Sequence, residues 1–253
     1  VQDYLIGTAA EWTRKYGVDA WRLDVPDEVS FRFLEHFKKR IRETNPEAYI
    51  IGEIWQKSTA WLRAGVFDGA MDYPLYFAIR DFAMKRTDGV ETFAERIKDV
   101  FLSAPDCVRP RQLAFCGNHD IPRPLTVCGG DTDRLFLQML LGGAVSIYYG
   151  DELGMSGGED PANRGAMAWG EQSDGIKPLY ISMIRFKEEH QGEMNVTEMR
   201  VQDGVLRLTF SGGDYMAFIA EPGGEKCFAV PDGMHLRFGN AQLSRGYALF
   251  ERK

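Results

Sequence analysis

A chain of 253 residues, 44% of them hydrophobic, is long enough to bury one large core and too apolar to be mainly disordered. A net charge of -7 without basic runs argues against a general nucleic-acid or anionic-membrane binder, so a neutral substrate fits better. No apolar stretch reaches about 18 residues, the length at which a membrane helix becomes plausible. The four cysteines, Cys107, Cys116, Cys128 and Cys227, form no CxxC pair, so metal spacing is absent and a disulfide framework is not expected. We therefore expect a soluble, cytoplasmic protein with reduced thiols.

The opening stretch, residues 1–17, predicts a helix. Gly17 is a plausible C-terminal stop, and the stretch lacks the charged-then-apolar layout of a signal peptide. Apolar and small side chains recur at helical spacing, at Val1, Leu5, Thr8, Trp12 and Tyr16. We expect the chain to open inside a helix of something larger.

Beyond Gly17, short apolar segments alternate with amphipathic ones. The pattern predicts strands at 18–25, 48–55, 67–73, 111–120 and 144–152. It predicts helices between them at 31–45, 76–85, 91–104 and 133–142. Short apolar strands separated by helices predict a parallel sheet that is buried on both faces, either an open doubly wound sheet or a barrel.

The pattern of apolar and polar residues changes at about Asn195. From there apolar and polar residues alternate around DG, GGD, PGG and PDG turns, which predicts a small antiparallel β domain. We therefore place a domain boundary between residues 192 and 193, with an α/β domain at 1–192 and a β domain at 193–253.

Polar residues recur at one end of each predicted strand. They are Arg22 and Asp24, then Glu53, then Asp72, then Asn118, His119 and Asp120, and finally Asp151 and Glu152. Because the carboxyl ends of parallel strands lie on one face of the sheet, these side chains should converge. A single carboxylate there is more often a helix cap or a surface ion pair, but carboxylates on successive strands favour a functional site.

Carboxylates without cysteine clusters or phosphate-binding glycine loops suggest acid/base or nucleophilic chemistry on a neutral substrate. Two carboxyl groups about 5 to 5.5 Å apart would support retaining glycoside hydrolysis. Arg22 shares a strand face with Asp24 and should favour its ionised form. Glu53 sits between Ile51 and Trp55, in apolar surroundings that favour the protonated acid.

Three segments, DAWRLDVPDEV, IIGEIW and FCGNHD, resemble three of the four short conserved regions of the α-amylase family of glycoside hydrolases, in the same order. The resemblance implies that Asp24 is the nucleophile and Glu53 the general acid/base. It implies that Asp120 holds sugar hydroxyls and stabilises the transition state, and it matches Arg22 and His119 to the family's supporting residues.

Further matches narrow the branch. Glu28, together with VFDGAMDYPL and IYYGDELGMSGGEDPANRGAMAW, resembles the neopullulanase, cyclomaltodextrinase and maltogenic amylase group. The resemblance implies that Asp160 and Arg164 bind glucose on the non-reducing side of the cleaved bond, with Trp55 near the opposite side. It also implies hydrolysis of α-1,4 bonds, with α-1,6 bonds as an alternative, in cyclodextrins, starch or pullulan.

The resemblance implies an α/β fold, a partial TIM (β/α)8-type barrel with about strands four to eight, followed by a small antiparallel β-sandwich domain. Eight strands and helices need about 250 residues, whereas five strands are used up by Tyr149. We therefore expect a homo-oligomer, or a complex with a missing N-terminal half, that covers the open sheet edges. Calcium binds many family members, but the domain that usually binds it is not in this chain, so no cofactor is expected.

Two rival functions stay open. One is a truncated, inactive half barrel that acts at most as a glucan-binding or assembly subunit. The other is a transglycosylase or isomerase of the same family. A nucleotide-binding sheet is disfavoured, because no GxGxxG or GxxxxGK motif follows any predicted strand.

Three tyrosines near the predicted site, Tyr73, Tyr148 and Tyr149, could stack on sugars, but aromatic residues in strands are more often core. We predict that all three belong to the core. His119 is expected to donate a hydrogen bond to substrate rather than to bind a metal, because no second histidine stands at ligand spacing.

Overall fold

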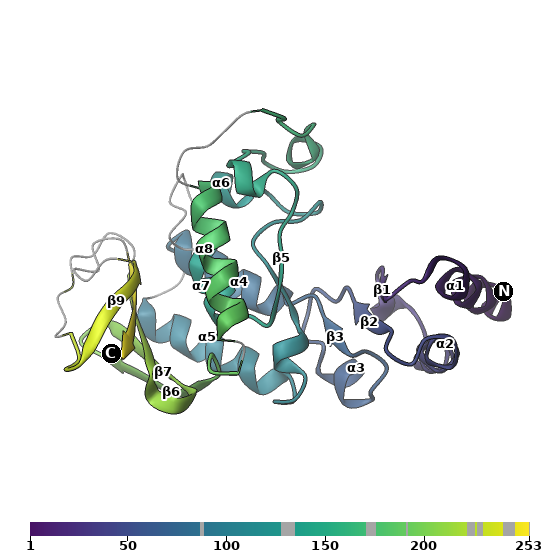
Figure 1. Cartoon of the computed structure of the whole chain (residues 1–253), viewed down its shortest axis with the longest axis horizontal. Coiled ribbons are helices and arrows are strands. Elements are labelled where there is room, and N and C mark those ends of the chain that lie inside the picture. The colour runs from purple at the N-terminus through teal and green to yellow at the C-terminus, as the bar shows by residue number, and fades with distance from the viewer. Residues whose placement is uncertain are drawn as a thin grey trace. The chain divides into compact units, whose positions relative to one another are not determined.

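The computed structural model describes residues 1–86, 89–127, 135–170, 176–190, 192–221, 226, 230–239 and 246–252 (Figure 1). The chain divides into two compact units. The first unit comprises residues 1–74 and 100–113, and the second comprises residues 75–99 and 114–253. Cys128 and Cys227 lie outside the described residues.

The first unit is built on a parallel sheet with the strand order β1-β2-β3. The strands are β1 (Ala20–Leu23), β2 (Tyr49–Gly52) and β3 (Gly69–Ala70), and they lie side by side in Figure 1. The register pairs Trp21 with Ile50, and Ile51 with Gly69. An isolated parallel bridge between Met71 and Leu113 follows β3. The predicted parallel pairing of the first three strands is therefore confirmed.

The helices of this unit are α1 (Gln2–Tyr16), α2 (Phe31–Thr44) and α3 (Thr59–Arg63), with short 3-10 helices η1 (Pro26–Glu28) and η2 (Arg109–Arg111). Helix α1 ends where the sequence predicts, since Gly17 has φ 62 and its N–H donates to the Thr13 carbonyl. Helix α2 begins at Ser30, whose hydroxyl accepts from the Phe33 N–H.

The predicted helix is confirmed, but the apolar stripe that indicated it is not the face that α1 buries. The buried residues are Ile6, Ala9, Ala10 and Thr13. The large side chains of the predicted stripe are exposed, with Leu5 at 50%, Trp12 at 53% and Tyr16 at 64%. Small side chains let α1 pack closely on its neighbour α2, which the spacing of the large apolar residues could not indicate.

Strand β1 also differs from the expectation of a strand buried on both faces. Its residues alternate between exposed and half-buried. In the described part of the chain β1 is an edge strand, paired with β2 alone. An edge position leaves one row of backbone groups and part of each sheet face without cover.

The second unit carries β5 (Ala144–Ser146) and, from Ala114 on, β4 (Leu113–Phe115), and these two strands pair with each other. Helix α4 (Tyr73–Ala83) runs into this unit and helix α5 (Val90–Ser103) runs out of it. Its other helices are α6 (Pro124–Val127), α7 (Leu135–Leu141) and α8 (Ile176–Glu189), with the 3-10 helices η4 (Asp151–Leu153) and η5 (Ala162–Arg164).

The predicted antiparallel β domain is confirmed as a five-stranded sheet with the order β6-β7-β8-β10-β9. Its strands are β6 (Val196–Gln202), β7 (Val205–Phe210), β8 (Tyr215–Ala220), β9 (Met234–Gly239) and β10 (Tyr247–Arg252). Asp203 and Gly204, both with positive φ, form the tight turn between β6 and β7. The boundary between residues 192 and 193 stays a prediction, since the two compact units divide the chain elsewhere.

Among the described cysteines, Cys107 is an exposed free thiol, and Cys116 is buried. In the described ranges no helix has both the length and the apolar character that crossing a membrane would require.

Candidate active site

The first unit joins three of the predicted site residues through one guanidinium group. Arg22 on β1 places Nη1 2.7 Å from Oδ1 of Asp24 and Nη2 2.5 Å from Oε2 of Glu53. Asp24 follows β1 directly, and Glu53 follows β2 directly. Because β1 and β2 are parallel and in register, with Leu23 opposite Gly52, their carboxyl ends bring the two acids together.

The two carboxyl groups have different surroundings. The Asp24 side chain is 73% exposed, whereas the Glu53 side chain is 3% exposed. Burial raises the pKa of Glu53, against the Arg22 guanidinium, which lowers it. The nearby Asp24 carboxyl also raises this pKa, while hydrogen bonds from Tyr73 and Trp55 lower it. Burial is the largest of these effects, so the net result is a raised pKa for the Glu53 carboxyl group.

Two aromatic rings line the Glu53 side of the cluster. The Tyr73 hydroxyl donates to Oε1 of Glu53 at 3.2 Å, and the Tyr73 ring is fully buried. The Trp55 ring stacks on Tyr73 with 4.4 Å between ring centroids and stays 45% exposed. The prediction that Tyr73 belongs to the core is confirmed, but sequence reasoning missed its hydrogen bond to Glu53, for which a tyrosine in an apolar run gives no signal.

The backbone turns sharply just after Asp24. Val25 has φ 40 and ψ 49, a left-handed conformation that is a genuine outlier for a β-branched residue. It forms the N-cap of η1, on which Glu28 is exposed. Such strain persists where the surrounding structure over-determines it, and it clusters at functional sites. The hydrophobic pattern of the sequence carries no trace of this turn.

The second unit joins four further predicted site residues. Nε2 of His119 lies 3.0 Å from Oδ2 of Asp120, and Nη2 of Arg164 lies 3.3 Å from Oδ1 of the same carboxylate. Nε of Arg164 lies 3.1 Å from Oδ1 of Asp160 and also donates to the His119 carbonyl at 2.9 Å. Asp120 is therefore flanked by two nitrogen side chains that leave it partly open to solvent.

A buried polar cluster lies beside these residues and was missed at the sequence level. Arg123 and Asn163 are fully buried, and Nη1 of Arg123 forms an ion pair of 2.9 Å with Oδ1 of Asp151. Burial raises the pKa of Asp151 to about 7, although Arg123 lowers it. The sequence places Asp151 among the strand-end carboxylates, and nothing in the local sequence identifies Arg123 as its partner.

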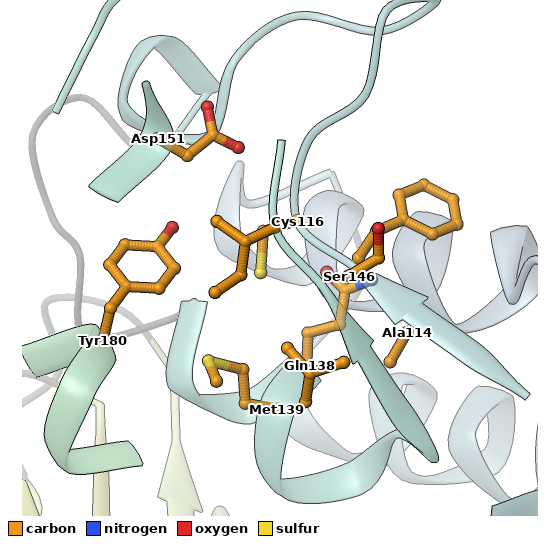
Figure 2. Close-up of a pocket in the computed structure, with 10 residues that line it drawn as sticks. Ala114, Cys116, Gln138, Met139, Ser146, Asp151 and Tyr180 are labelled. Atoms are coloured by element: carbon orange, nitrogen blue, oxygen red, sulfur yellow. The ribbon is translucent and has the colours of Figure 1, made fainter. Parts of the chain in front are cut away.

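Asp151 borders a cavity of about 10 Å³, roughly the space that one water molecule needs. Figure 2 shows Asp151, Tyr180, Cys116 and Met139 around this cavity. The apolar side chains of its lining keep solvent away from the carboxyl group, which is the physical cause of the raised pKa.

The two tyrosines at the end of β5, Tyr148 and Tyr149, differ in how far they are buried. Tyr149 is 38% exposed and its hydroxyl donates to the Gly165 carbonyl, so the prediction that it is core is wrong. The Arg123 guanidinium also lies over the Tyr149 ring, with its Cζ 4.8 Å from the ring centroid. Tyr148 is half-buried and its ring lies 4.5 Å from that of Tyr149.

The structure therefore forms two clusters from the predicted residues. Arg22, Asp24, Glu53 and Trp55 belong to the first unit, and His119, Asp120, Asp160 and Arg164 belong to the second. Within the described residues no group of three or more His, Cys, Asp or Glu side chains is arranged to hold a metal ion.

Comparison with known proteins places these clusters in a family. The family model described as "Alpha amylase, catalytic domain" matches residues 1–203. A cyclomaltodextrinase of Geobacillus thermopakistaniensis is 41% identical over 224 residues, which cover 85% of this chain and 38% of that protein. A maltogenic α-amylase of Bacillus acidopullulyticus is 40% identical, covering 83% of this chain and 38% of that protein.

A solved structure is similar over the whole length. The debranching enzyme of Nostoc punctiforme, in a crystal soaked with acarbose, gives a TM-score of 0.84 at 26% identity, over 99% of this chain and 60% of that one. The expected fold class, a partial TIM-type barrel followed by an antiparallel β domain, is thereby confirmed. The chain spans about two fifths of the length of the curated relatives, 38% in both cases. It belongs to the α-amylase family of glycoside hydrolases.

Proposed function

We propose that the chain carries the catalytic carboxylates of a retaining α-glucan hydrolase, with Asp24 as nucleophile and Glu53 as general acid/base. The observation that carries the proposal is the single Arg22 guanidinium that bridges an exposed and a buried carboxyl group. Retaining glycosidases need one ionised and one protonated carboxyl group close together. Two observations support this assignment: burial raises the pKa of Glu53, the proposed acid, and the side chain of Asp24, the proposed nucleophile, is exposed to solvent.

In the proposed reaction, an Asp24 oxygen attacks the anomeric carbon while Glu53 protonates the glycosidic oxygen, so the leaving sugar departs as a neutral alcohol. The product of this step is a glycosyl ester of Asp24. Glu53, now ionised, takes a proton from water, and the water oxygen attacks the anomeric carbon. This second step releases the sugar and restores both carboxyl groups.

We propose that the second cluster binds the sugar. Asp120 and His119 present oxygen and nitrogen atoms that can hydrogen-bond sugar hydroxyls. Asp160 and Arg164, which form an ion pair with each other, are proposed to bind the glucose unit on the non-reducing side of the cleaved bond. Trp55 offers an exposed ring face beside Glu53 for stacking on a second sugar. Glu28 is proposed to contribute on the same side as Trp55, and its exposed position on η1 permits this.

The relatives suggest the substrate. Their names, cyclomaltodextrinase, maltogenic α-amylase and neopullulanase, point to cyclodextrins, maltose-based oligosaccharides and pullulan. We therefore propose α-1,4 glucosidic bonds as the main target, with α-1,6 bonds as the alternative. No step requires a cofactor.

The test is release of reducing sugar from cyclodextrin, starch and pullulan by the purified chain. We expect Glu53→Gln to lower the rate by about a thousandfold, which lies within the range for general acid/base groups. Glu43→Gln is the matched control, because Glu43 is an exposed residue of α2 whose partner is Arg40. Equal rates in the wild type and in Glu53→Gln would refute the assignment of Glu53.

The same preparation distinguishes the rival functions. A chain that binds maltohexaose, retains this affinity in Glu53→Gln and releases no sugar is a glucan-binding or assembly subunit. Products longer than the substrate, formed from maltose, identify a transglycosylase, because a sugar hydroxyl then replaces water at the covalent intermediate.

We also propose that the chain associates with a second copy. The first unit exposes Tyr4 (74%), Trp12 (53%) and Tyr16 (64%) on α1, which is unusual for a free surface. Light scattering should report an oligomer, and Trp12→Glu should shift it toward the monomer. A monodisperse wild-type monomer would rule this out.

A cytoplasmic location is proposed on chemical grounds. Cys107 is an exposed free thiol, and one relative is named an intracellular maltogenic amylase. Thiol titration of protein from native cells, rather than refolded material, would test whether this cysteine is reduced in place.

A further inference from the structure

The second unit contains a buried cation that the proposed chemistry does not use. The side chain of Arg123 is fully buried, which is rare for an arginine unless it is paired. The residue lies just before α6, three positions after Asp120 in the chain. Removing one partner of such a buried pair leaves an uncompensated charge, so the contacts of Arg123 bear directly on the local structure.

Arg123 ties its own loop to the segment that follows β5. Its Nη1 donates to the Tyr149 carbonyl at 2.6 Å and to Oδ1 of Asp151 at 2.9 Å. Its Nε donates to the Asn163 carbonyl at 3.0 Å, and its backbone N–H donates to the Gly157 carbonyl at 2.9 Å. One residue therefore fixes four points between residues 149 and 163.

Asn163 links the contacts of Arg123 to the second cluster, which contains His119, Asp120 and Arg164. The amide of its buried side chain donates to the carbonyls of His119 at 2.8 Å and Ile121 at 3.0 Å. Asn163 lies in the three-residue helix η5 together with Arg164. Because the backbone and the side chain of Asn163 are both fixed by hydrogen bonds, the position of the adjacent Arg164 Cα atom is fixed as well.

The contact between Arg164 and Asp120 needs such support. The Arg164 side chain is 45% exposed and that of Asp120 is 28% exposed, with 3.3 Å between Nη2 and Oδ1. An ion pair this open to solvent contributes little by itself and does not order a loop. The segment is packed tightly instead, since a Cβ atom on Gly157 would lie 2.5 Å from the Ala162 carbonyl oxygen.

We propose that Arg123 is a positioning residue that sets the Arg164 guanidinium against Asp120 and the His119 carbonyl. Its effect on sugar affinity rests on the proposed function, whereas its effect on the segment 157–165 does not. Arg123 touches no reacting atom in this scheme, so it acts on binding through Arg164 and leaves the bond-breaking carboxylates of the first unit alone.

The test uses the full chain and three variants. Arg123→Lys keeps the charge next to Asp151 but loses the fork that reaches two carbonyls. The double variant Arg123→Met with Asp151→Asn removes the same contacts without leaving a buried charge unpaired, which protects against simple misfolding. Lys187→Met is the matched control, because Lys187 is a half-buried cation whose Nζ donates to the carbonyls of Met139 and Gly142.

Hydrogen exchange gives the readout that does not need activity. We expect the peptides covering 157–165 to exchange at least about tenfold faster in both Arg123 variants, because local opening becomes easier. Strands β6 to β8 should keep the wild-type rate, and Lys187→Met should leave 157–165 unchanged. Wild-type exchange at 157–165 in both Arg123 variants, or equal acceleration in the β domain, would overturn the proposal.

Titration with maltohexaose gives the second readout. Both Arg123 variants should bind about tenfold more weakly than the wild type. In turnover assays KM should rise with little change in kcat, a division that a general loss of stability does not produce. Faster exchange at 157–165 with unchanged affinity would overturn the claim that Arg123 controls sugar binding. A wild type that does not bind maltohexaose would refute the proposed function, while the exchange data would still decide the positioning role.

Discussion

At the scale of single residues, Glu53 lies among groups with opposite effects on its proton affinity. Burial raises its pKa, and the hydrogen bond from Tyr73 is one of the contacts that lower it. Tyr73→Phe removes that contact and should raise the pKa of Glu53 further. Since Glu53 acts as an acid only while protonated, the basic limb of the kcat/KM profile should move to higher pH.

The matched control for this change is Tyr16→Phe, since Tyr16 is 64% exposed on α1. It should leave the pH profile in place. A basic limb that stays put or moves to lower pH in Tyr73→Phe would show that the Tyr73 hydroxyl does not act on Glu53.

Asp151 gives a second prediction at this scale. Its pKa is raised from 3.8 to about 7, with burial as the largest cause, so the folded chain keeps a proton that the unfolded chain releases. The free energy of unfolding should therefore fall by up to about 1.4 kcal/mol per pH unit as the pH rises from about 4 to about 7. Asp151→Asn lacks this titration, so chemical denaturation of the two proteins across that window should show a difference that grows with pH. A constant difference would contradict the raised pKa.

At the scale of elements, close packing around β2 leaves no room for a side chain at Gly52. A Cβ atom on Gly52 would lie 2.6 Å from the ring of Phe67, which is itself buried. Gly52→Ala should destabilise the chain by about 1 to 3 kcal/mol, the usual cost of overpacking. Gly7, in the interior of α1, has open space around the corresponding position, so Gly7→Ala should stabilise by about 0.5 to 1 kcal/mol. Denaturant midpoints that shift in the same direction for both would refute the packing argument.

The elements themselves were largely predictable, because hydrophobic period and turn residues are local signals. Gly17 ends α1 as expected, and the Asp203-Gly204 turn joins β6 to β7. The buried face of α1 was not predictable, because it depends on how closely Ala9 and Ala10 approach α2, and spacing alone cannot report this.

The strand-end residues of the candidate site could be predicted from the sequence. The contacts and the backbone turn that hold these residues in place could not. Asp24 and Glu53 could be paired because parallel strands align their carboxyl ends. The contacts of Arg123 join residues up to 40 positions apart in the chain, and the left-handed turn at Val25 contradicts the preference of a β-branched residue. Such features arise only after the chain has folded.

At the scale of the whole molecule, each of the two compact units contains a buried apolar cluster among its described residues. Ile41 is fully buried in the core of the first unit, and Phe250 is buried in the β domain of the second. Each replacement by Ala should cost about 2 to 5 kcal/mol. Hydrogen exchange should rise mainly in the unit that carries the change. If both variants accelerate exchange equally throughout the chain, the units unfold as one cooperative body.

The shared guanidinium of Arg22 also bears on the order of events in the proposed reaction. Once Asp24 becomes a glycosyl ester, it loses the negative charge that faces both Arg22 and Glu53. The Arg22 guanidinium then faces only the Glu53 carboxyl group. The proton affinity of Glu53 therefore falls after its proton has gone to the leaving sugar, which favours the ionised form that must accept a proton from water. Covalent capture of the sugar would thus itself switch Glu53 from acid to base, and the same contact that assembles the pair would time its two half-reactions.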